Sequence, residues 1–210
     1  MLQALSASPY AAILFHVTLI IATVRNLPDA LVPRVDYRIV TKLDAATDWH
    51  DALAGVQTVI HCAARVHVMR DHAQDPLTEF RRVNTQGTET LARAAARSGV
   101  KRLIFLSSIK VNGESTLPVS PFDEASPAKP QDSYAISKWE AEQALTRVSA
   151  ETGLEVVVLR CPLVYGPGVK GNLLRLLQAV DQGIPLPLAL ARNRRISFIL
   201  ITSRTPLPPA

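Results

Sequence analysis

LEVVVLR, at residues 154–160, is a nearly continuous apolar run, and two earlier stretches of the chain are built like it. These are VQTVIH at residues 56–61 and KRLIFL at residues 101–106. Such runs are typical of parallel strands that are covered on both faces. Helical spacing over residues 77–98 and 133–152 separates the three runs. The alternation predicts an α/β fold with a doubly wound parallel sheet.

Glycine and aspartate mark the ends of the two predicted helices. Gly99 and Gly153 follow the last helical residues, where a glycine commonly ends a helix. Asp132 or Ser133 can cap the start of the second helix. Nearer the N-terminus, residues 36–40 are predicted to form a further short strand.

The stretch from Pro9 to Val24 carries no formal charge at neutral pH and was therefore considered as a membrane segment. It is shorter than the ~20 apolar residues of a spanning helix and includes His16. No lysine or arginine precedes Arg25, which disfavours a signal peptide. The β-branched residues from Val17 onward favour a buried strand. A membrane-associated protein that uses residues 9–24 is kept as an alternative.

The composition is that of a folded chain. It has 210 residues, of which 48% are apolar and 20% charged, so it can bury a core. Its two cysteines, Cys62 and Cys161, lie in apolar runs, as buried thiols do in a reducing cytoplasm. No pair of histidines combines a helical metal spacing with a nearby carboxylate, so no metal site is predicted.

The net charge of +5 comes mostly from the end of the chain. Four arginines and no acid lie from residue 191 onward, which leaves a net charge of +1 for the rest. A basic tail alone gives only a weak, salt-sensitive attraction to nucleic acid. We therefore expect no nucleic-acid partner.

Tyr134 and Lys138 are four residues apart and would share one face of the second helix. A nearby ammonium favours the phenolate and lowers the pKa of a tyrosine toward neutral pH. Such a pair could move a proton at a sugar or alcohol hydroxyl while the lysine holds a ribose. The same spacing also arises by chance in many helices, so the pair alone does not decide the function.

Small and hydroxyl side chains follow two of the apolar runs. Ser107 and Ser108 come directly after the run at residues 101–106. Ala63 and Ala64 stand just beyond the run at residues 56–61, and small residues there let a flat group approach the backbone. Open α/β sheets bind ligands at the carboxyl ends of their strands. His61, at the end of the same run, is interpreted as a packed strand residue.

Four motifs in order resemble the extended short-chain dehydrogenase/reductase superfamily. They are VIHCAARVHV at residues 59–68, FRRVNTQGTETLARAAARSGVKRLIFLSSIKVNGE at 80–114, SYAISKWEAE at 133–142 and LRCPLVYGPGVKGN at 159–172. They are similar to the NAD-dependent epimerase/dehydratase family of nucleotide-sugar enzymes, near the UDP-glucose 4-epimerases and UDP-hexulose 4-reductases. The resemblance covers about residues 30–190 and implies a Rossmann-like fold.

The resemblance implies a catalytic site made of Ser108, Tyr134 and Lys138. Tyr134 would be the acid or base on a sugar hydroxyl while hydride passes to or from nicotinamide. Lys138 would bind the nicotinamide ribose, and Ser108 would bridge Tyr134 and the sugar oxygen.

The same resemblance implies further contacts with the cofactor, NAD or NADP, and with a nucleotide-sugar substrate. The implied cofactor-binding residues are Ala63, Ala64, Asn84, Pro162, Tyr134 and Lys138. Asn172, together with Ser108, would meet the substrate. A cytoplasmic enzyme of polysaccharide biosynthesis is implied, and a homodimer stays open.

Both ends of the chain depart from the family pattern. The first 54 residues hold no glycine, so the GxxGxxG loop that receives the cofactor diphosphate is missing. Lys42 stands where the family has an acid. We expect three parts: an atypical apolar segment at residues 1–24, an incomplete dinucleotide-binding core at 25–190, and a basic, proline-rich tail at 191–210 that replaces most of the C-terminal substrate lobe.

These departures leave three functions open. The first is a working nucleotide-sugar epimerase, reductase or dehydratase, and the second is a non-catalytic remnant of that family. The third is the membrane-associated protein described above. A truncated or frame-disrupted gene product accounts for both ends, and a short member with divergent ends is the alternative. Weak NAD binding is expected for the chain as written.

Overall fold

The computed structural model describes residues 19–66, 75–116, 121–166, 171–184 and 198–200. Contacts divide the chain into two units, residues 18–161 and residues 1–17 with 162–210. The first unit holds the predicted sheet and both predicted helices.

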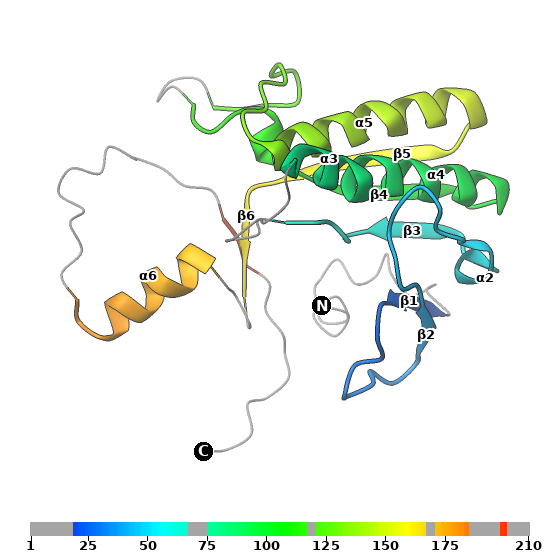
Figure 1. Cartoon of the computed structure of the whole chain (residues 1–210), viewed down its shortest axis with the longest axis horizontal. Coiled ribbons are helices and arrows are strands. Elements are labelled where there is room, and N and C mark those ends of the chain that lie inside the picture. The colour runs from blue at the N-terminus through cyan, green and yellow to red at the C-terminus, as the bar shows by residue number, and fades with distance from the viewer. Residues whose placement is uncertain (1–18, 67–74, 117–120, 167–170, 185–197, 201–210) are drawn as a thin grey trace, which may run out of the picture. The chain divides into compact units, whose positions relative to one another are not determined.

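Three parallel strands form the main sheet of the first unit (Figure 1). Their order is β3(Thr58–His61), β4(Arg102–Ser108), β5(Glu155–Cys161). In the register of the strands, His61 lies beside Phe105, and Ser107 lies beside Arg160. The three predicted strands and their parallel pairing are confirmed, except that β4 continues through Ser108.

Helix α5(Ser133–Thr152) begins and ends where the sequence predicted. The Asp132 carboxylate caps it by accepting a hydrogen bond of 2.6 Å from the Ala135 amide. Gly153 ends it with φ of +75°, a left-handed conformation that strains other L residues.

The other predicted helix is divided into three parts. Its elements are α3(Pro76–Phe80), the π-helical segment η2(Arg81–Gln86) and α4(Gly87–Arg97). A π-helical segment has a wider turn than an α-helix, so the prediction of one regular α-helix over 77–98 is wrong for residues 81–86. In and just after this segment, Val83, Asn84, Gly87 and Thr88 are buried.

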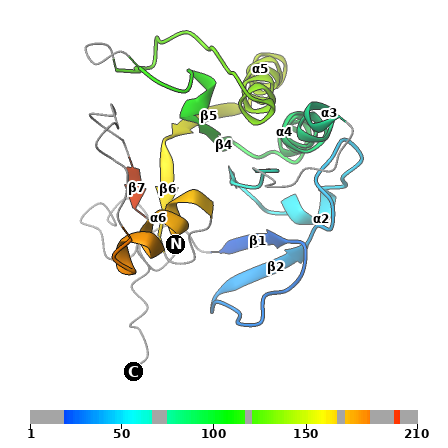
Figure 2. The same cartoon turned by 60° about the vertical axis from the view of Figure 1, so that its left-hand side comes forward.

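Helices α4 and α5 lie side by side over one face of the sheet (Figure 1, Figure 2). Leu103 and Phe105 of β4 are fully buried and form one apolar cluster with Leu145 and Val148 of α5. Ile60, which alternates with the buried His61 on β3, is 56% exposed. The core of the unit therefore lies between the sheet and these two helices.

Strands β1 and β2 form a separate parallel pair. They are β1(Ile20–Val24) and β2(Val35–Ile39). In the common doubly wound order 3-2-1-4-5-6, the strand numbered 1 lies between strands 2 and 4. The pair β2-β1 matches the strands on one side of that central strand, and β3-β4-β5 matches the strands on its other side. Within the described ranges, no strand pairs with both β1 and β3.

The structure describes only part of the predicted N-terminal segment and of the predicted tail. The strand expected from Val17 onward exists as residues 20–24, with most of its side chains half-buried. Residues 1–18 lie outside the described residues, as does the basic tail apart from 198–200. None of the described helices has the length and apolar character needed to cross a bilayer.

The second unit contributes three described elements. They are β6(Leu163–Tyr165), α6(Gly171–Asp181) and β7(Phe198–Leu200). Strands β6 and β7 pair in parallel. The chain passes from β5 of the first unit into this unit at Pro162.

Candidate active site

Tyr134 and Ser108 come close at the carboxyl end of β4, where the Ser108 hydroxyl lowers the pKa of the Tyr134 phenol. Tyr134 stands in the first turn of α5, and its ring packs edge-on against Phe80. Ser108 also accepts a hydrogen bond from the Lys110 amide at 3.3 Å. The direct hydrogen bond expected between the tyrosine and the serine stays a prediction.

Asp132 connects the turn after β4 to the start of α5. One of its carboxylate oxygens caps the helix, and the other accepts a hydrogen bond of 2.6 Å from Lys110 Nζ. Lys110 lies two residues after Ser108, and Tyr134 lies two residues after Asp132. This ion pair consequently holds the two hydroxyl groups near one another.

The pKa of Tyr134 is raised above its ordinary value of 10.0, chiefly because the phenol is buried. The Asp132 carboxylate raises it further, whereas the Ser108 hydroxyl lowers it. The expectation that the Lys138 ammonium lowers this pKa is wrong, because Lys138 is not among the groups that shift it. The reason is geometric, since Lys138 Nζ lies 4.0 Å from the centroid of the Phe105 ring.

Lys138 is only 2% exposed. Burial lowers its pKa from 10.5 to about 8, although the carboxylate of Glu142 acts in the opposite direction. Among the described residues, Nζ of Lys138 has the Phe105 ring as a neighbour and forms no hydrogen bond. The ammonium group thus keeps its donors for a further partner.

His61 is a packed strand residue, in agreement with the sequence-based interpretation. Its Nε2 lies 2.9 Å from Oγ1 of Thr88, and its ring stacks on Phe105. Burial, together with Lys138, lowers the pKa of His61 to about 3, so the imidazole is neutral at physiological pH. Within the described part of the chain, no cluster of three or more histidine, cysteine or acidic residues could hold a metal ion.

Asn84 fixes the loop that follows β3. Its Oδ1 accepts a hydrogen bond of 2.7 Å from the Arg65 amide, and its Nδ2 donates to the Arg65 carbonyl at 3.0 Å. Nδ2 also donates to Ser137 Oγ on α5 at 3.0 Å. Just before Arg65, Ala63 is exposed and Ala64 is half-buried. The amide of Asn84 therefore positions the alanine loop, and its predicted cofactor contact stays a prediction.

Pro162 and Asn172 belong to the second unit. Asn172 is in α6, and its side chain lies outside the described residues. Their predicted roles beside the cofactor and the substrate stay predictions.

The sequence analysis missed a buried ion pair behind the candidate site. Glu142 of α5 is 5% exposed, and Arg160 of β5 holds its carboxylate with two nitrogens. Ser107 of β4 donates its hydroxyl to the same carboxylate. The signal was available, because Glu142 follows Tyr134 and Lys138 on the same helix face at intervals of four residues.

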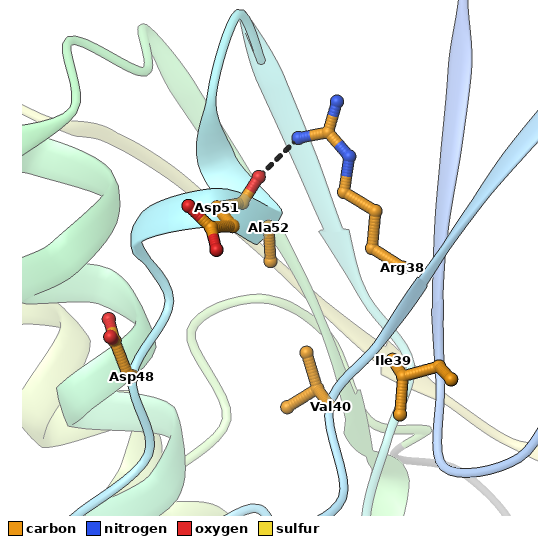
Figure 3. Close-up of a pocket in the computed structure, with 6 residues that line it drawn as sticks. All are labelled: Arg38, Ile39, Val40, Asp48, Asp51 and Ala52. Atoms are coloured by element: carbon orange, nitrogen blue, oxygen red, sulfur yellow. Dashed lines mark hydrogen bonds between the residues drawn. The ribbon is translucent and has the colours of Figure 1, made fainter.

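A shallow pocket lies between β2 and α2(His50–Leu53), away from Tyr134 (Figure 3). It is lined by Arg38, Ile39, Val40, Asp48, Asp51 and Ala52. The Arg38 guanidinium donates to the Asp51 carbonyl and pairs with the Asp36 carboxylate at 3.0 Å. Lys42, which stands where an acid was expected, is exposed two residues beyond Val40.

Residues 17–199 match the model of the NAD dependent epimerase/dehydratase family. The chain belongs to this family, as the four motifs predicted. The match crosses both of the predicted part boundaries, near residues 24 and 190.

Relatives and solved structures agree with this family. The chain is 47% identical to a UDP-glucose 4-epimerase of Vibrio cholerae over 161 residues, which cover 77% of this chain and 49% of the relative. It is 35% identical to a dTDP-glucose 4,6-dehydratase of Streptomyces niveus over 117 residues, 56% of this chain and 34% of the relative. The chain thus spans about half or less of the length of these relatives.

A solved structure has the same arrangement of strands and helices. It is a dTDP-glucose 4,6-dehydratase of Streptomyces venezuelae, a double mutant with NAD bound. The TM-score is 0.66 at 27% identity, and the match covers 81% of this chain and 55% of the other. The Rossmann-like fold class is therefore confirmed.

The described residues fit one end of NAD better than the other. At the nicotinamide end, the buried Lys138 ammonium has donors without a hydrogen-bond partner among the described residues, and the exposed Ala63 leaves the strand end open. At the diphosphate end, no glycine occurs in the first 54 residues, and Lys42 replaces an acid. The residues present therefore fit the nicotinamide end alone, and the cofactor contacts of the individual residues stay predictions.

Replacing Lys138 by methionine is expected to stabilise the fold at pH 7. The folded pKa of about 8 lies below the ordinary 10.5, so the native state disfavours the ammonium. Between these two pH values the unfolded chain binds the extra proton, so wild-type stability rises with pH over that window. We expect Lys138→Met to add about 2 kcal/mol at pH 7, a gain that shrinks toward pH 10.5.

Urea unfolding at a series of pH values measures this difference. Lys129→Met, at an exposed loop position, is the control and should change the stability little at any pH. A Lys138→Met variant that is less stable than the wild type at pH 7 would contradict the costly burial of the ammonium.

Proposed function

We propose that this chain carries the proton-transfer half of a nucleotide-sugar epimerase or dehydratase site. The observation that carries the proposal is the placement of Tyr134, in the first turn of α5, beside Ser108 at the end of β4, with Lys138 one turn along α5. Similarity to UDP-glucose 4-epimerase and dTDP-glucose 4,6-dehydratases supports the substrate class, a sugar attached to a nucleoside diphosphate.

In this proposal each of the three side chains has a separate task. Tyr134 gives a proton to, or takes one from, a hydroxyl or ketone oxygen of the sugar. Ser108, which lies beside the phenol, holds the same sugar oxygen. Lys138 donates to the ribose of the cofactor from the helix face below. NAD, when bound, supplies the hydride acceptor and donor.

In this proposal the raised pKa of Tyr134 has to fall when the cofactor binds. Tyr134 acts as a base near neutral pH only as a phenolate, and burial of the phenol disfavours the phenolate. The four-residue spacing lets Lys138 swing from the Phe105 ring toward the site, where its ammonium would stabilise the phenolate.

The finer assignments follow from the relatives and are part of the proposal. Epimerisation of a UDP-hexose is favoured over net reduction or dehydration, because the 47% identical relative is a UDP-glucose 4-epimerase. A cytoplasmic role in polysaccharide synthesis fits that substrate class. NADP in place of NAD, and a homodimer, are alternatives that binding and sedimentation measurements can separate.

A non-catalytic protein of the same family is the second candidate function. The glycine-free first 54 residues and the lysine at position 42 favour it. Both candidates use the same fold, and they differ in whether the chain retains NAD.

The chain as written is expected to bind NAD weakly. Backbone donors of a glycine-rich loop contribute about 1.5–3 kcal/mol each to a charged diphosphate. Loss of two such bonds weakens affinity by ~10²-fold or more, at about 1.4 kcal/mol per tenfold. Calorimetry should therefore detect little or no binding at micromolar NAD.

A variant joined to a GxxGxxG-bearing N-terminal segment tests the same point in the opposite direction. If it folds, much of the NAD affinity should return. Micromolar affinity of the unaltered chain would favour the working enzyme over the non-catalytic protein.

Tyr134→Phe is expected to abolish turnover and leave the fold intact, because it removes one hydroxyl. A general acid–base group contributes about 10²–10⁴-fold to the rate. Interconversion of UDP-glucose and UDP-galactose, measured with saturating NAD in the form of the chain that binds it, reports the loss. Tyr37→Phe removes a hydroxyl that accepts from the Val32 amide on the β1–β2 pair, and it should stay active. Full activity of Tyr134→Phe would refute the assigned role.

A further inference from the structure

Glu142 is the only carboxylate among the buried residues of the described ranges, and no step of the proposed chemistry uses it. It lies on α5 one turn beyond Lys138 and two turns beyond Tyr134. Its position on this face makes it a neighbour of the candidate site without being part of the reacting surface.

The carboxylate of Glu142 bridges two neighbouring strands at one register position. Ser107 of β4 and Arg160 of β5 are paired in the sheet, and both donate to it. Arg160 does so with Nε at 3.1 Å and Nη2 at 2.6 Å, a two-nitrogen geometry that matches a carboxylate well. The next register pair is Ser108 with Cys161, so the bridge lies directly behind the candidate site.

Two cations belong to this part of the unit. Arg160 pairs with the Glu142 carboxylate, and its guanidinium also packs over the Trp139 ring at 5.5 Å. Lys138 lies one turn before Glu142 on α5, with Nζ over the Phe105 ring. A buried ammonium over an aromatic face still needs a counter-charge, because burial disfavours a charged group.

Few other groups could supply that counter-charge. The titratable groups that act on Lys138 are Glu142 of α5, His61 at the end of β3, Cys62 directly after β3, and Cys161 of β5. His61 is neutral, because its burial strongly disfavours the imidazolium. Cys62 is exposed, contrary to the burial predicted from the sequence, and its raised pKa favours the uncharged thiol. Glu142 is therefore the principal anion that Lys138 faces.

We propose that Glu142 is a positioning residue that keeps Lys138 an ammonium, with Arg160 and Ser107 fixing its carboxylate in place. This inference deepens the proposed function and rests on it. An ammonium can both donate to a ribose and stabilise a phenolate, whereas a neutral amine cannot stabilise a phenolate. Glu142 acts through Lys138 and touches neither cofactor nor substrate. An alternative, purely structural role would tie α5 to the sheet without affecting the charge of Lys138.

The test is the titration of Lys138 in the full chain, followed by NMR of ¹³Cε-labelled lysine. Lys138→Met identifies the signal. In Glu142→Gln, which keeps the shape of the side chain but replaces the charge and one acceptor oxygen by an amide, we expect the apparent pKa of Lys138 to fall by about one unit. Glu140→Gln is the matched control, because Glu140 is on the same helix and pairs with an arginine, Arg81, but does not act on Lys138. It should leave the titration unchanged.

A folded Glu142→Gln variant with an unchanged Lys138 titration would overturn the proposal. If this variant does not fold, the double variant Lys138→Met/Glu142→Gln decides. The proposal expects the double variant to fold, because the uncompensated ammonium is gone and the Arg160 guanidinium, with its side chain 23% exposed, can be hydrated when it loses its carboxylate partner. Failure of the double variant as well would assign Glu142 to the fold alone and overturn the proposal.

The titration needs neither NAD nor a sugar, so it separates this inference from the proposed function. A lowered Lys138 pKa in a chain that never turns over substrate would support the positioning role and count against the enzyme. Turnover of substrate together with an unchanged Lys138 titration in Glu142→Gln would support the enzyme and overturn the positioning role.

Discussion

The candidate site depends on how Asp132 joins the end of β4 to the start of α5. Its carboxylate caps the helix and pairs with Lys110, which lies just after Ser108 in the turn beyond the strand. Helix caps and part-exposed ion pairs each contribute only about 1 kcal/mol. The cap and the ion pair matter because they place the Tyr134 phenol near the Ser108 hydroxyl.

Behind that contact, the unit buries charges that an ordinary core would avoid. Lys138 and Glu142 are both almost inaccessible, and Arg160 completes the series from the sheet side. Buried ion pairs are weak contributors to net stability, because desolvation offsets much of their attraction. Buried charges of this kind, close to the carboxyl ends of β4 and β5, are typical of functional sites.

Local patterns in the sequence predicted most of the fold, and tertiary contacts account for what they missed. Apolar runs predicted β3, β4 and β5, and Asp132 and Gly153 predicted the ends of α5, since each of these signals is carried by neighbouring residues. The π-helical segment η2 has no such signal, because Asn84 reaches across to Arg65 and Ser137 in other elements. The direction of the Tyr134 pKa was wrong for the same reason, since burial and the position of Lys138 over Phe105 are set by packing. Pro162 and Asn172 lie in the second unit, where the resemblance alone supports their roles.

Titration of the Tyr134 phenol tests the central claim most directly, namely that Tyr134 and Ser108 form one site. With ¹³Cζ-labelled tyrosine, the Tyr134 signal is identified by its loss in Tyr134→Phe. The account predicts a pKa above the ordinary 10.0, because the phenol is buried, and a further rise in Ser108→Ala, because the hydroxyl that lowers it is removed. A Tyr134 that titrates at its ordinary value and does not respond to Ser108→Ala would contradict it.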